Sequence, residues 1–203
     1  MGKLWDLLIQ TVLDENEIAL FHDGHCVSSI SNQADFKSDN TFVQDICRCL
    51  NDQQVQKKEI HSLTILQGPG YFTGIRAGIV IAKAWMDSFS IPVRLVSSFE
   101  YVRGCFSAPE KTAILIRASK TEGYAGFFRK GQLVSQECIK LETVSSYGQE
   151  WKWFTPSVAF KSLSGIQYIS PSLYLPQQYE EVTRSEQIAP HYGRSLEELF
   201  QPL

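Results

Sequence analysis

One glycine-rich stretch constrains the fold of this 203-residue chain more than any other, namely Gly68-Pro69-Gly70-Tyr71-Phe72-Thr73-Gly74-Ile75-Arg76-Ala77-Gly78. The apolar and β-branched run before it, Ser62 to Leu66, predicts a buried strand, and a long helical pattern follows it. Gly68 and Gly70 flank a proline whose ring fixes φ. The stretch therefore predicts a rigid strand-to-helix turn.

The helix that leaves this turn is expected to run from Thr73 to Phe89, because Pro92 follows shortly afterwards. Thr73 is the expected N-cap residue, since its hydroxyl can accept a bond from a free amide of the first turn. Arg76 is expected to have an anionic partner, because a cation in the first turn opposes the helix dipole. Helical spacing predicts a core-facing stripe made of Ile75, Ile79, Ala82, Met86 and Phe89.

The glycine loop has two interpretations. A loop of this kind at a helix N-terminus can bind a phosphate group. Alternatively, its glycines only allow helix and sheet to approach closely, and Gly74, Gly78 and Ala82 then form a groove of small residues along the helix. The loop lacks the Gly-Lys-Ser/Thr ending of a P-loop and the Gly-x-Gly-x-x-Gly of a dinucleotide site, which favours close packing.

Composition indicates a folded chain without a strong nucleic-acid surface. The chain is 43% hydrophobic, enough for a sizeable core, and its formal net charge of −3 signals no basic patch. No apolar run is long enough to cross a membrane, and no signal peptide is expected. The five cysteines, an odd number without zinc-finger spacing, fit reduced thiols in a cytoplasm.

Hydrophobic periodicity predicts the order of elements along the chain. The first half is expected to hold three strands, a helix, a strand, the long helix, a further strand and a short helix, at residues 4–12, 17–21, 26–31, 41–51, 62–66, 73–89, 93–96 and 97–104. The second half is expected to open with strands at residues 112–117 and 124–129, a third strand after Lys130-Gly131, and to end in a helix at residues 195–200.

The glycine-rich stretch, together with Ala82-Lys83, Ile91-Pro92 and Val96-Ser97-Ser98-Phe99-Glu100, resembles the signature of the TsaB (YeaZ) family without a gap over roughly thirty residues. The resemblance implies an α/β fold of two lobes of the actin/Hsp70/sugar-kinase (ASKHA) type, with mixed sheets flanked by helices and a reduced second lobe. The lobes are expected at residues 1–107 and 108–203. The motif positions are Gly68, Pro69, Gly70, Phe72, Thr73, Gly74 and Arg76.

The resemblance also implies a function. A TsaB-like chain is expected to be a non-catalytic scaffold or dimerisation subunit that supports a TsaD-like partner in making N6-threonylcarbamoyladenosine (t6A) on tRNA. A TsaE-like ATPase is a further candidate partner, and tRNA is expected to bind only within the complex. ATP and magnesium are expected to belong to the partner proteins. The alternative is an enzyme, either a glycoprotease-like peptidase or an actin-like nucleotide hydrolase.

The first strand departs from the family pattern. An Ile-Asp-Thr-Ser segment usually closes this strand, and in the ASKHA fold its aspartate holds the metal of a bound nucleotide. Here Gln10 takes the place of the aspartate and Val12 that of the serine, while Thr11 is retained. An amide cannot supply the negative charge that Mg²⁺ requires. The departure therefore argues against ATP chemistry in this chain.

No catalytic or metal-binding residue is proposed from the sequence. The cluster His22, Asp23, His25 and Cys26 is interpreted as a hairpin turn, because Asp-Gly between apolar strands is a turn signal. The His-x-x-x-His pair that binds metal in TsaD proteins is absent. His191 is expected to be a lone, solvated histidine.

Two further segments resemble the family partially. Ala118 to Tyr124 is similar to an Asp-Ala-Arg-x-x-Glu-Val-Tyr segment, with Arg117 in place of the aspartate. Residues 190–194 are similar to a Pro-x-Tyr-Leu-Arg ending. These matches extend the resemblance over most of the chain but leave residues 131–188 without a counterpart.

The two long helices of the first lobe carry more apolar or small positions than one core-facing stripe requires. In TsaB-like proteins such a helix pair packs against the equivalent pair of another subunit, either a second copy or TsaD. One surface serving both would make the two dimers mutually exclusive. The expected interface residues are Phe42, Ile46, Cys49, Gly78, Ala82 and Trp85.

Overall fold

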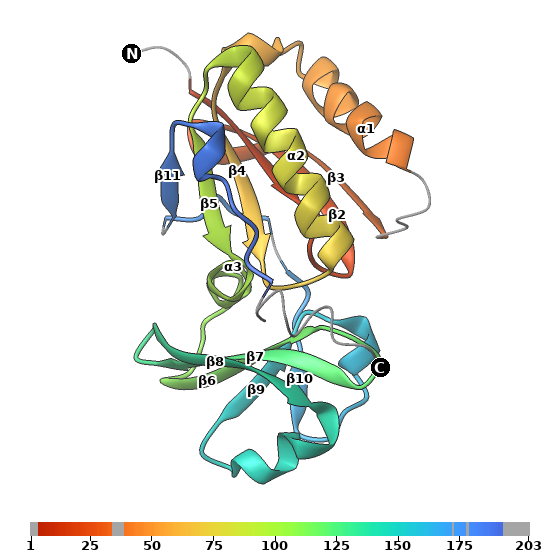
Figure 1. Ribbon diagram of the computed structural model, residues 1–203, viewed down its shortest axis with the longest axis vertical. Helices are drawn as coiled ribbons and strands as arrows, with labels where there is room; N and C mark the ends of the chain where they lie inside the picture. Colours follow the sequence, from red (N-terminus) through yellow and green to blue (C-terminus); the bar gives the residue numbers. More distant parts are fainter. Residues whose placement is uncertain (1–3, 34–38, 172, 178, 193–203) are drawn as a thin grey trace.

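The computed structural model describes residues 4–33, 39–171, 173–177 and 179–192. Two sheets stand end to end, with the short helix α3 (Ser98–Gly104) between them (Figure 1). In the described residues the first sheet has six strands in the order β11-β5-β4-β1-β2-β3, and the second has five in the order β10-β9-β6-β7-β8. Both sheets mix parallel and antiparallel pairs, so the predicted mixed α/β architecture is confirmed.

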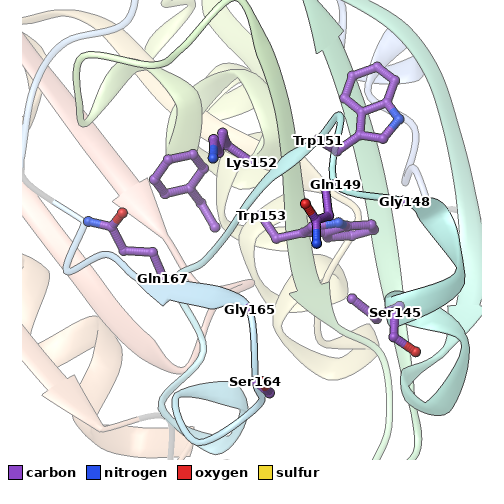
Figure 2. Close-up of a pocket in the computed structure, with 11 residues that line it drawn as sticks. Ser145, Gly148, Gln149, Trp151, Lys152, Trp153, Ser164, Gly165 and Gln167 are labelled. Carbon is purple, nitrogen blue, oxygen red and sulfur yellow. The ribbon is translucent and has the colours of Figure 1, made fainter.

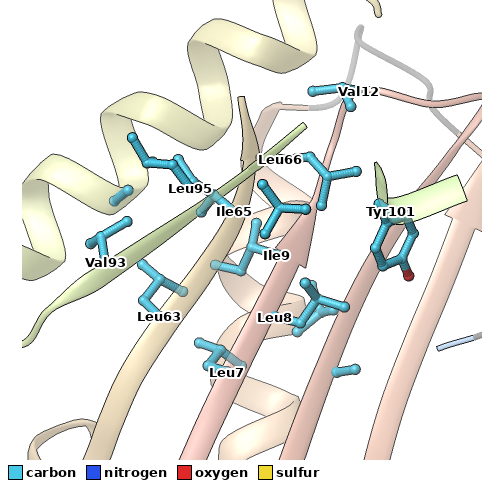
Figure 3. Close-up of a cluster of buried hydrophobic side chains, with 14 of the residues drawn as sticks. Leu7, Leu8, Ile9, Val12, Leu63, Ile65, Leu66, Val93, Leu95 and Tyr101 are labelled. Carbon is cyan, nitrogen blue, oxygen red and sulfur yellow. The ribbon is translucent and has the colours of Figure 1, made fainter. Parts of the chain in front are cut away.

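The first sheet consists of β1 (Trp5–Gln10), β2 (Glu15–His22), β3 (His25–Gln33), β4 (Ile60–Gly68), β5 (Val93–Ser97) and β11 (Glu180–Val182). Its central strands β1 and β4 are nearly continuous apolar runs and are buried, which is typical of strands covered on both faces. Helices α1 (Asp39–Asp52) and α2 (Phe72–Phe89) lie over one face (Figure 1). Figure 3 shows the resulting core, in which side chains of β1, β4 and β5 meet.

The hairpin predicted at His22 to His25 is confirmed. His22 pairs with His25, and the two residues between them have positive φ, 49° at Asp23 and 81° at Gly24. Two consecutive left-handed residues define the tight turn that matches the twist of antiparallel strands. The His22 ring stacks on Trp5 at a centroid distance of 4.3 Å, so this histidine packs as part of the sheet surface.

Helix α2 follows the strand-to-helix turn as predicted, but it begins one residue earlier than expected. Its N-cap residue is Tyr71, which makes no side-chain capping bond, so the expected role of Thr73 as N-cap is wrong. The helix ends at Phe89, and Ser90 adopts a left-handed conformation with φ 54°. The predicted core stripe is confirmed at its four buried positions, Ile75, Ile79, Ala82 and Met86.

The second sheet consists of β6 (Lys111–Arg117), β7 (Glu122–Arg129), β8 (Gln132–Lys140), β9 (Lys152–Thr155) and β10 (Ile166–Tyr168). Residues alternate between its two faces, as expected for strands. Ile114 and Ile116 join the core that contains α3 and the first sheet. Ala113 and Leu115 join a separate core on the other face, with Phe127 and Trp153. Four short 3-10 helices complete the described elements, η1 (Lys57–Glu59), η2 (Leu141–Tyr147), η3 (Val158–Phe160) and η4 (Ser185–Gln187).

After the last strand of the second sheet, the chain returns to the first sheet. Strand β11, at residues 180–182, pairs with β5 and so forms an edge of the first sheet. A division at residues 107 and 108 therefore leaves one strand of the first sheet in the second half of the sequence. The helix expected at residues 195–200 lies outside the described residues.

Within the part of the chain that the structure describes, no helix has the length and apolar character needed to span a bilayer.

Candidate functional site

The glycine-rich turn is shaped by close backbone packing. A Cβ atom on Gly68 would lie 2.1 Å from the carbonyl oxygen of His191, and one on Gly70 would lie 2.2 Å from the carbonyl oxygen of Val12. The Tyr71 amide donates to that same Val12 oxygen at 2.9 Å. Gly68 also has a φ of 111°, which side chains rarely adopt. The geometry supports the packing interpretation of the loop, since two of its glycines are required by neighbouring backbone.

The exposed side of the motif is aromatic. Phe72 and Tyr192 approach with a ring-centroid distance of 4.9 Å, and the Arg76 guanidinium lies 5.5 Å from the Phe72 ring. Among the described residues no carboxylate pairs with Arg76. The anionic partner expected for Arg76 is therefore not found there, and the Phe72 ring contacts this cation instead.

The small residues of α2 face the sheet of their own chain. The Thr11 hydroxyl donates to the carbonyl of Gly74 at 2.7 Å, and a Cβ atom on Gly78 would lie 3.0 Å from that hydroxyl oxygen. Ala82 is fully buried. Gly78 and Ala82 are therefore buried within the chain, and their expected role at a partner interface stays a prediction. Ile46, Cys49 and Trp85 are also buried within the chain, and Phe42 is partly buried.

Gln10 is fully engaged where the family pattern places a metal-holding aspartate. Its side-chain oxygen accepts from the amides of Val12 and Leu13 at 2.7 and 2.9 Å. Its side-chain nitrogen donates to the Glu15 carbonyl at 2.7 Å and to the Glu17 carboxylate at 3.4 Å. The amide thereby stabilises the turn between β1 and β2. Both the oxygen and the nitrogen of this side chain are committed to partners within the chain.

Glu17 is a buried acid beside Gln10. The Tyr101 hydroxyl donates to its carboxylate at 3.2 Å. Burial raises the pKa of Glu17 above its ordinary value, and the bonds from Gln10 and Tyr101 only partly offset this. Burial likewise raises the pKa of Tyr101, so its hydroxyl stays protonated and acts as a donor. The ring of Tyr174 stacks on the ring of Tyr101 at a centroid distance of 5.3 Å.

A polar network that the sequence did not reveal joins the two sheets. Asp14 follows β1, and one of its oxygens accepts from the Tyr71 hydroxyl at 3.0 Å. The other accepts from the Ser157 hydroxyl and from the Val158 amide, both at 2.9 Å. Arg117, at the end of β6, donates to the Tyr71 oxygen at 3.1 Å. The second half of the chain thus contacts both the β1–β2 turn and the start of α2.

His191 is a second contact between the two sheets. Its backbone amide donates to the Gln67 carbonyl of β4 at 2.8 Å, and its ring lies 3.0 Å from the Gln136 amide nitrogen of β8. Burial lowers the pKa of His191. The expectation of a solvated histidine is therefore wrong. Sequence reasoning missed both contacts, because no local pattern pairs residues so far apart along the chain.

The outer side of the helix pair carries an apolar groove. It lies between α1 and α2, beside η1, and has a volume of about 180 Å³. Its lining is mostly apolar and includes the buried residues Ile46 and Trp85. The lining residues are Val43, Ile46, Cys47, Lys57, Ile81, Ala84 and Trp85. Of the six residues expected at a partner interface, Ile46 and Trp85 line this groove, whereas Phe42, Cys49, Gly78 and Ala82 do not.

A larger hollow, of about 470 Å³, lies on the second sheet (Figure 2). Its lining comes from the segment before β9, from β9 itself and from the turn before β10. The indole ring of Trp153 is packed against Phe127 and Tyr147, with both centroids at 5.6 Å. Trp151 lies against Phe127 and under Arg129. These rings contribute mainly to the lobe's own core and leave little free ring surface in the hollow.

Among the described residues, no group of three or more histidine, cysteine, aspartate or glutamate side chains converges in a way that could hold a metal ion. Cys47 and Cys49 differ in environment, since Cys49 is buried and Cys47 lines the groove, as expected for positions two apart on a helix.

Comparison with solved structures identifies the class of fold. A Pseudomonas aeruginosa protein described as similar to peptidase YeaZ is 20% identical, with a TM-score of 0.69 and 94% of this chain and 100% of that chain covered. A second structure, YeaZ from Pseudomonas aeruginosa, is 18% identical, with a TM-score of 0.68 and 93% and 99% covered. The ethanolamine utilization protein EutJ from Carboxydothermus hydrogenoformans gives a TM-score of 0.55 at 8% identity, with 84% and 86% covered. The fold is the two-lobed α/β fold of the actin-like (ASKHA) class, as the sequence predicted.

Sequence comparison specifies the family further. The family model described as TsaD, tRNA N6-adenosine threonylcarbamoyltransferase, matches residues 37–157, which is more than half of the chain. The tRNA threonylcarbamoyladenosine biosynthesis protein TsaB of Bacillus subtilis is 37% identical over 51 residues. That alignment spans 25% of this chain and 22% of the Bacillus protein. Within the group that the TsaD model defines, the chain belongs to the TsaB (YeaZ) family.

Proposed function

We propose that the chain is a non-catalytic scaffold subunit in the biosynthesis of threonylcarbamoyladenosine on tRNA, and that it binds and supports a TsaD-like subunit. The observation that carries the proposal is the apolar groove on the outer side of α1 and α2. The similarity to TsaB of Bacillus subtilis, a tRNA threonylcarbamoyladenosine biosynthesis protein, supports the pathway.

The groove has the properties of a helix-docking surface. Val43 on α1 is 56% exposed and Val80 on α2 is 65% exposed, although the opposite sides of both helices are anchored on the sheet. Ala84 is small and exposed between them, which allows another helix to approach closely. Exposed apolar residues next to a groove are typical of protein contact sites. The groove therefore fits the apolar face of a partner helix.

The same groove would serve a second copy of this chain, so homodimer and heterodimer would be mutually exclusive. We place tRNA and a TsaE-like ATPase only in the larger assembly, and the assembly in the cytoplasm. ATP and magnesium then belong to the partner proteins. This assignment is supported by Gln10, whose amide is committed to the β1–β2 turn and which carries no charge for a metal ion.

Val43→Arg tests the partner surface, because Val43 lines the groove and is 56% exposed. A charge in the groove would lose its water on docking without gaining a partner, so we expect the affinity for the TsaD-like subunit to fall at least tenfold in calorimetry. Val134→Arg is the matched control, because Val134 is 53% exposed on β8, far from the groove along the chain. The control should bind like the wild type. Equal affinity of both variants and the wild type would exclude the groove as the docking site.

The enzyme alternative is a peptidase, the activity named in the description of one similar solved structure, or a nucleotide hydrolase. We expect the isolated chain to show no ATP turnover above background and at most weak nucleotide binding. Calorimetry with ATP and magnesium measures this directly. Submicromolar binding accompanied by turnover would overturn the non-catalytic assignment while leaving the groove test unaffected.

A further inference from the structure

The two sheets contact each other in two chemically different ways. On the α3 side the contact is apolar, since Phe99 of α3 approaches Gly126 of β7 so closely that a Cβ atom there would lie 2.6 Å from the ring. Tyr124 and Phe128 of the second sheet belong to the same buried core as Phe99. This side is continuous core, and apolar contacts of this kind are not broken without exposing buried surface to water.

On the other side the contact is a set of hydrogen bonds centred on Asp14. Both carboxylate oxygens are used, one by the Tyr71 hydroxyl and the other by the Ser157 hydroxyl and the Val158 amide. Asp14 belongs to the first sheet's β1–β2 turn, whereas Ser157 and Val158 follow β9 of the second sheet. One side chain therefore makes three hydrogen bonds of 2.9 to 3.0 Å, and the two from Ser157 and Val158 connect the two sheets.

Tyr71 and Arg117 extend this connection. Tyr71 is the N-cap residue of α2, and Arg117 reaches its hydroxyl from the end of β6. The pKa of Tyr71 is raised to about 12 by its burial and by Asp14, so the hydroxyl remains a donor to the carboxylate at neutral pH. Arg117 stands where the family resemblance expects an aspartate. A cation at this position can donate to the Tyr71 oxygen, which a carboxylate cannot do.

Little space remains beside these bonds. A cavity of about 10 Å³, smaller than one water molecule requires, is lined by residues of the β1–β2 turn and of the segments around β10, among them Gln10, Asp14, Val158 and Tyr168. The two sheets are thus held together by polar contacts at Asp14 and by buried apolar side chains at α3. His191 with Gln136 adds one further polar contact between the sheets.

We propose that Asp14 is a latch that holds the second sheet against the start of α2, and that the two lobes open about α3 when the latch is released. Hydrogen bonds to a carboxylate can be exchanged for bonds to water, whereas the α3 contact would have to expose aromatic surface. Opening therefore begins at the Asp14 side. The latch fixes the position of the second lobe relative to α2, the helix that carries part of the proposed partner surface. The latch does not depend on whether that surface binds a TsaD-like subunit.

Amide hydrogen exchange of Asp14→Ala tests the latch. We expect exchange in residues 10–14 and 155–158 to become at least tenfold faster, while exchange in β4 and α3 stays within twofold of the wild type. Glu15→Ala is the matched control, because Glu15 is a neighbouring carboxylate that accepts a hydrogen bond from Ser31 of the first sheet. The control should leave residues 155–158 unchanged.

Ser157→Ala provides a milder variant that removes one donor from the second-sheet side. If Asp14 and Ser157 act as one latch, adding Ser157→Ala to Asp14→Ala should not accelerate exchange further. Small-angle X-ray scattering should show a larger radius of gyration for Asp14→Ala and an unchanged radius for Glu15→Ala. The proposal is overturned if exchange rises evenly over the whole chain, if Asp14→Ala behaves like the control, or if the effects of the two substitutions simply add.

Discussion

The two sides of α2 differ in what holds them in place. On the sheet side Gly78 and Ala82 are buried, and the Thr11 hydroxyl leaves no room for a larger residue at position 78. On the outer side Val80 and Ala84 are exposed, and the fold gives them no internal contact that requires their apolar character. A small residue on the first side is a steric requirement of the monomer. Apolar residues on the second side fit the partner surface that we propose.

A matched pair of substitutions on α2 should give the largest difference. Ala82→Arg inserts a long cation into a site without free space, which should cost more than about 4 kcal/mol and leave little folded protein. Ala84→Arg, half a turn away on the exposed side, should change the free energy of unfolding by less than about 0.5 kcal/mol. Urea unfolding measures both. Similar stabilities of the two variants would contradict the described orientation of the helix.

Gly70→Val should be the next most damaging change. Its Cβ atom would lie 2.2 Å from the carbonyl oxygen of Val12, and backbone cannot move aside as a flexible side chain can. We expect a loss of about 3 kcal/mol or more in the free energy of unfolding. Gly148→Ala is the control, since its φ of 76° is unusual but nothing lies within 4 Å of the added atom. It should cost only about 1 kcal/mol.

Thr11→Val tests the polar contact beneath α2. The substitution keeps the shape of the side chain but removes the hydroxyl that donates to Gly74. The expected loss is about 1 kcal/mol. Thr73→Val on the exposed start of the same helix should cost less than about 0.5 kcal/mol, because Thr73 is not the N-cap residue. Thermal unfolding compares the two. A larger loss at Thr73 would restore the capping role that the structure does not support.

Glu17→Gln should give the smallest effect and a distinctive pH dependence. Burial raises the pKa of Glu17 above its ordinary value of 4.5, so the folded chain holds this proton to a higher pH than the unfolded chain does. Stability attributable to Glu17 is therefore greatest below pH 4.5 and declines as pH rises through the folded pKa. Glutamine at position 17 does not ionise, so it removes this decline in stability with pH, and its side-chain oxygen can still accept the hydrogen bond from the Tyr101 hydroxyl. The variant should be more stable than the wild type near pH 8 and show a flatter profile of melting temperature against pH.

Local patterns account for most of the first sheet. The Asp23-Gly24 turn, the apolar runs of β1 and β4 and the stripe on α2 each depend on residues close together in the sequence, and each is found where expected. The end of α3 at Gly104 is also correct, and Ser97 accepts the capping bond from the Phe99 amide. Periodicity and capping chemistry are sufficient for such features, because their partners lie within a few residues.

Contacts between distant residues were not predictable in the same way. The sequence correctly marked Gln10 as a departure from the family pattern, but its bonds to the β1–β2 turn were not foreseen. Asp14 was assigned only to a turn, although its partners lie more than a hundred residues away at Ser157 and Val158. His191 was taken as solvated because its ring partner, Gln136, lies 55 residues away along the chain. The expected interface residues stay a prediction, but the burial of Gly78 and Ala82 was not foreseen for a partner surface, since helical spacing alone does not state which of two faces meets the sheet.

The return of β11 to the first sheet has a consequence for synthesis of the chain on the ribosome. β5 ends at Ser97, but the strand that covers its edge begins at Glu180, so 82 residues separate them. At about 5 to 20 residues per second, the edge of β5 stays unpaired for on the order of ten seconds after it has been made. An unpaired edge can add a strand from another chain. During that interval the edge of β5 is open to pairing with a neighbouring polypeptide, and this exposure ends only when residues 180–182 have been made and pair with it.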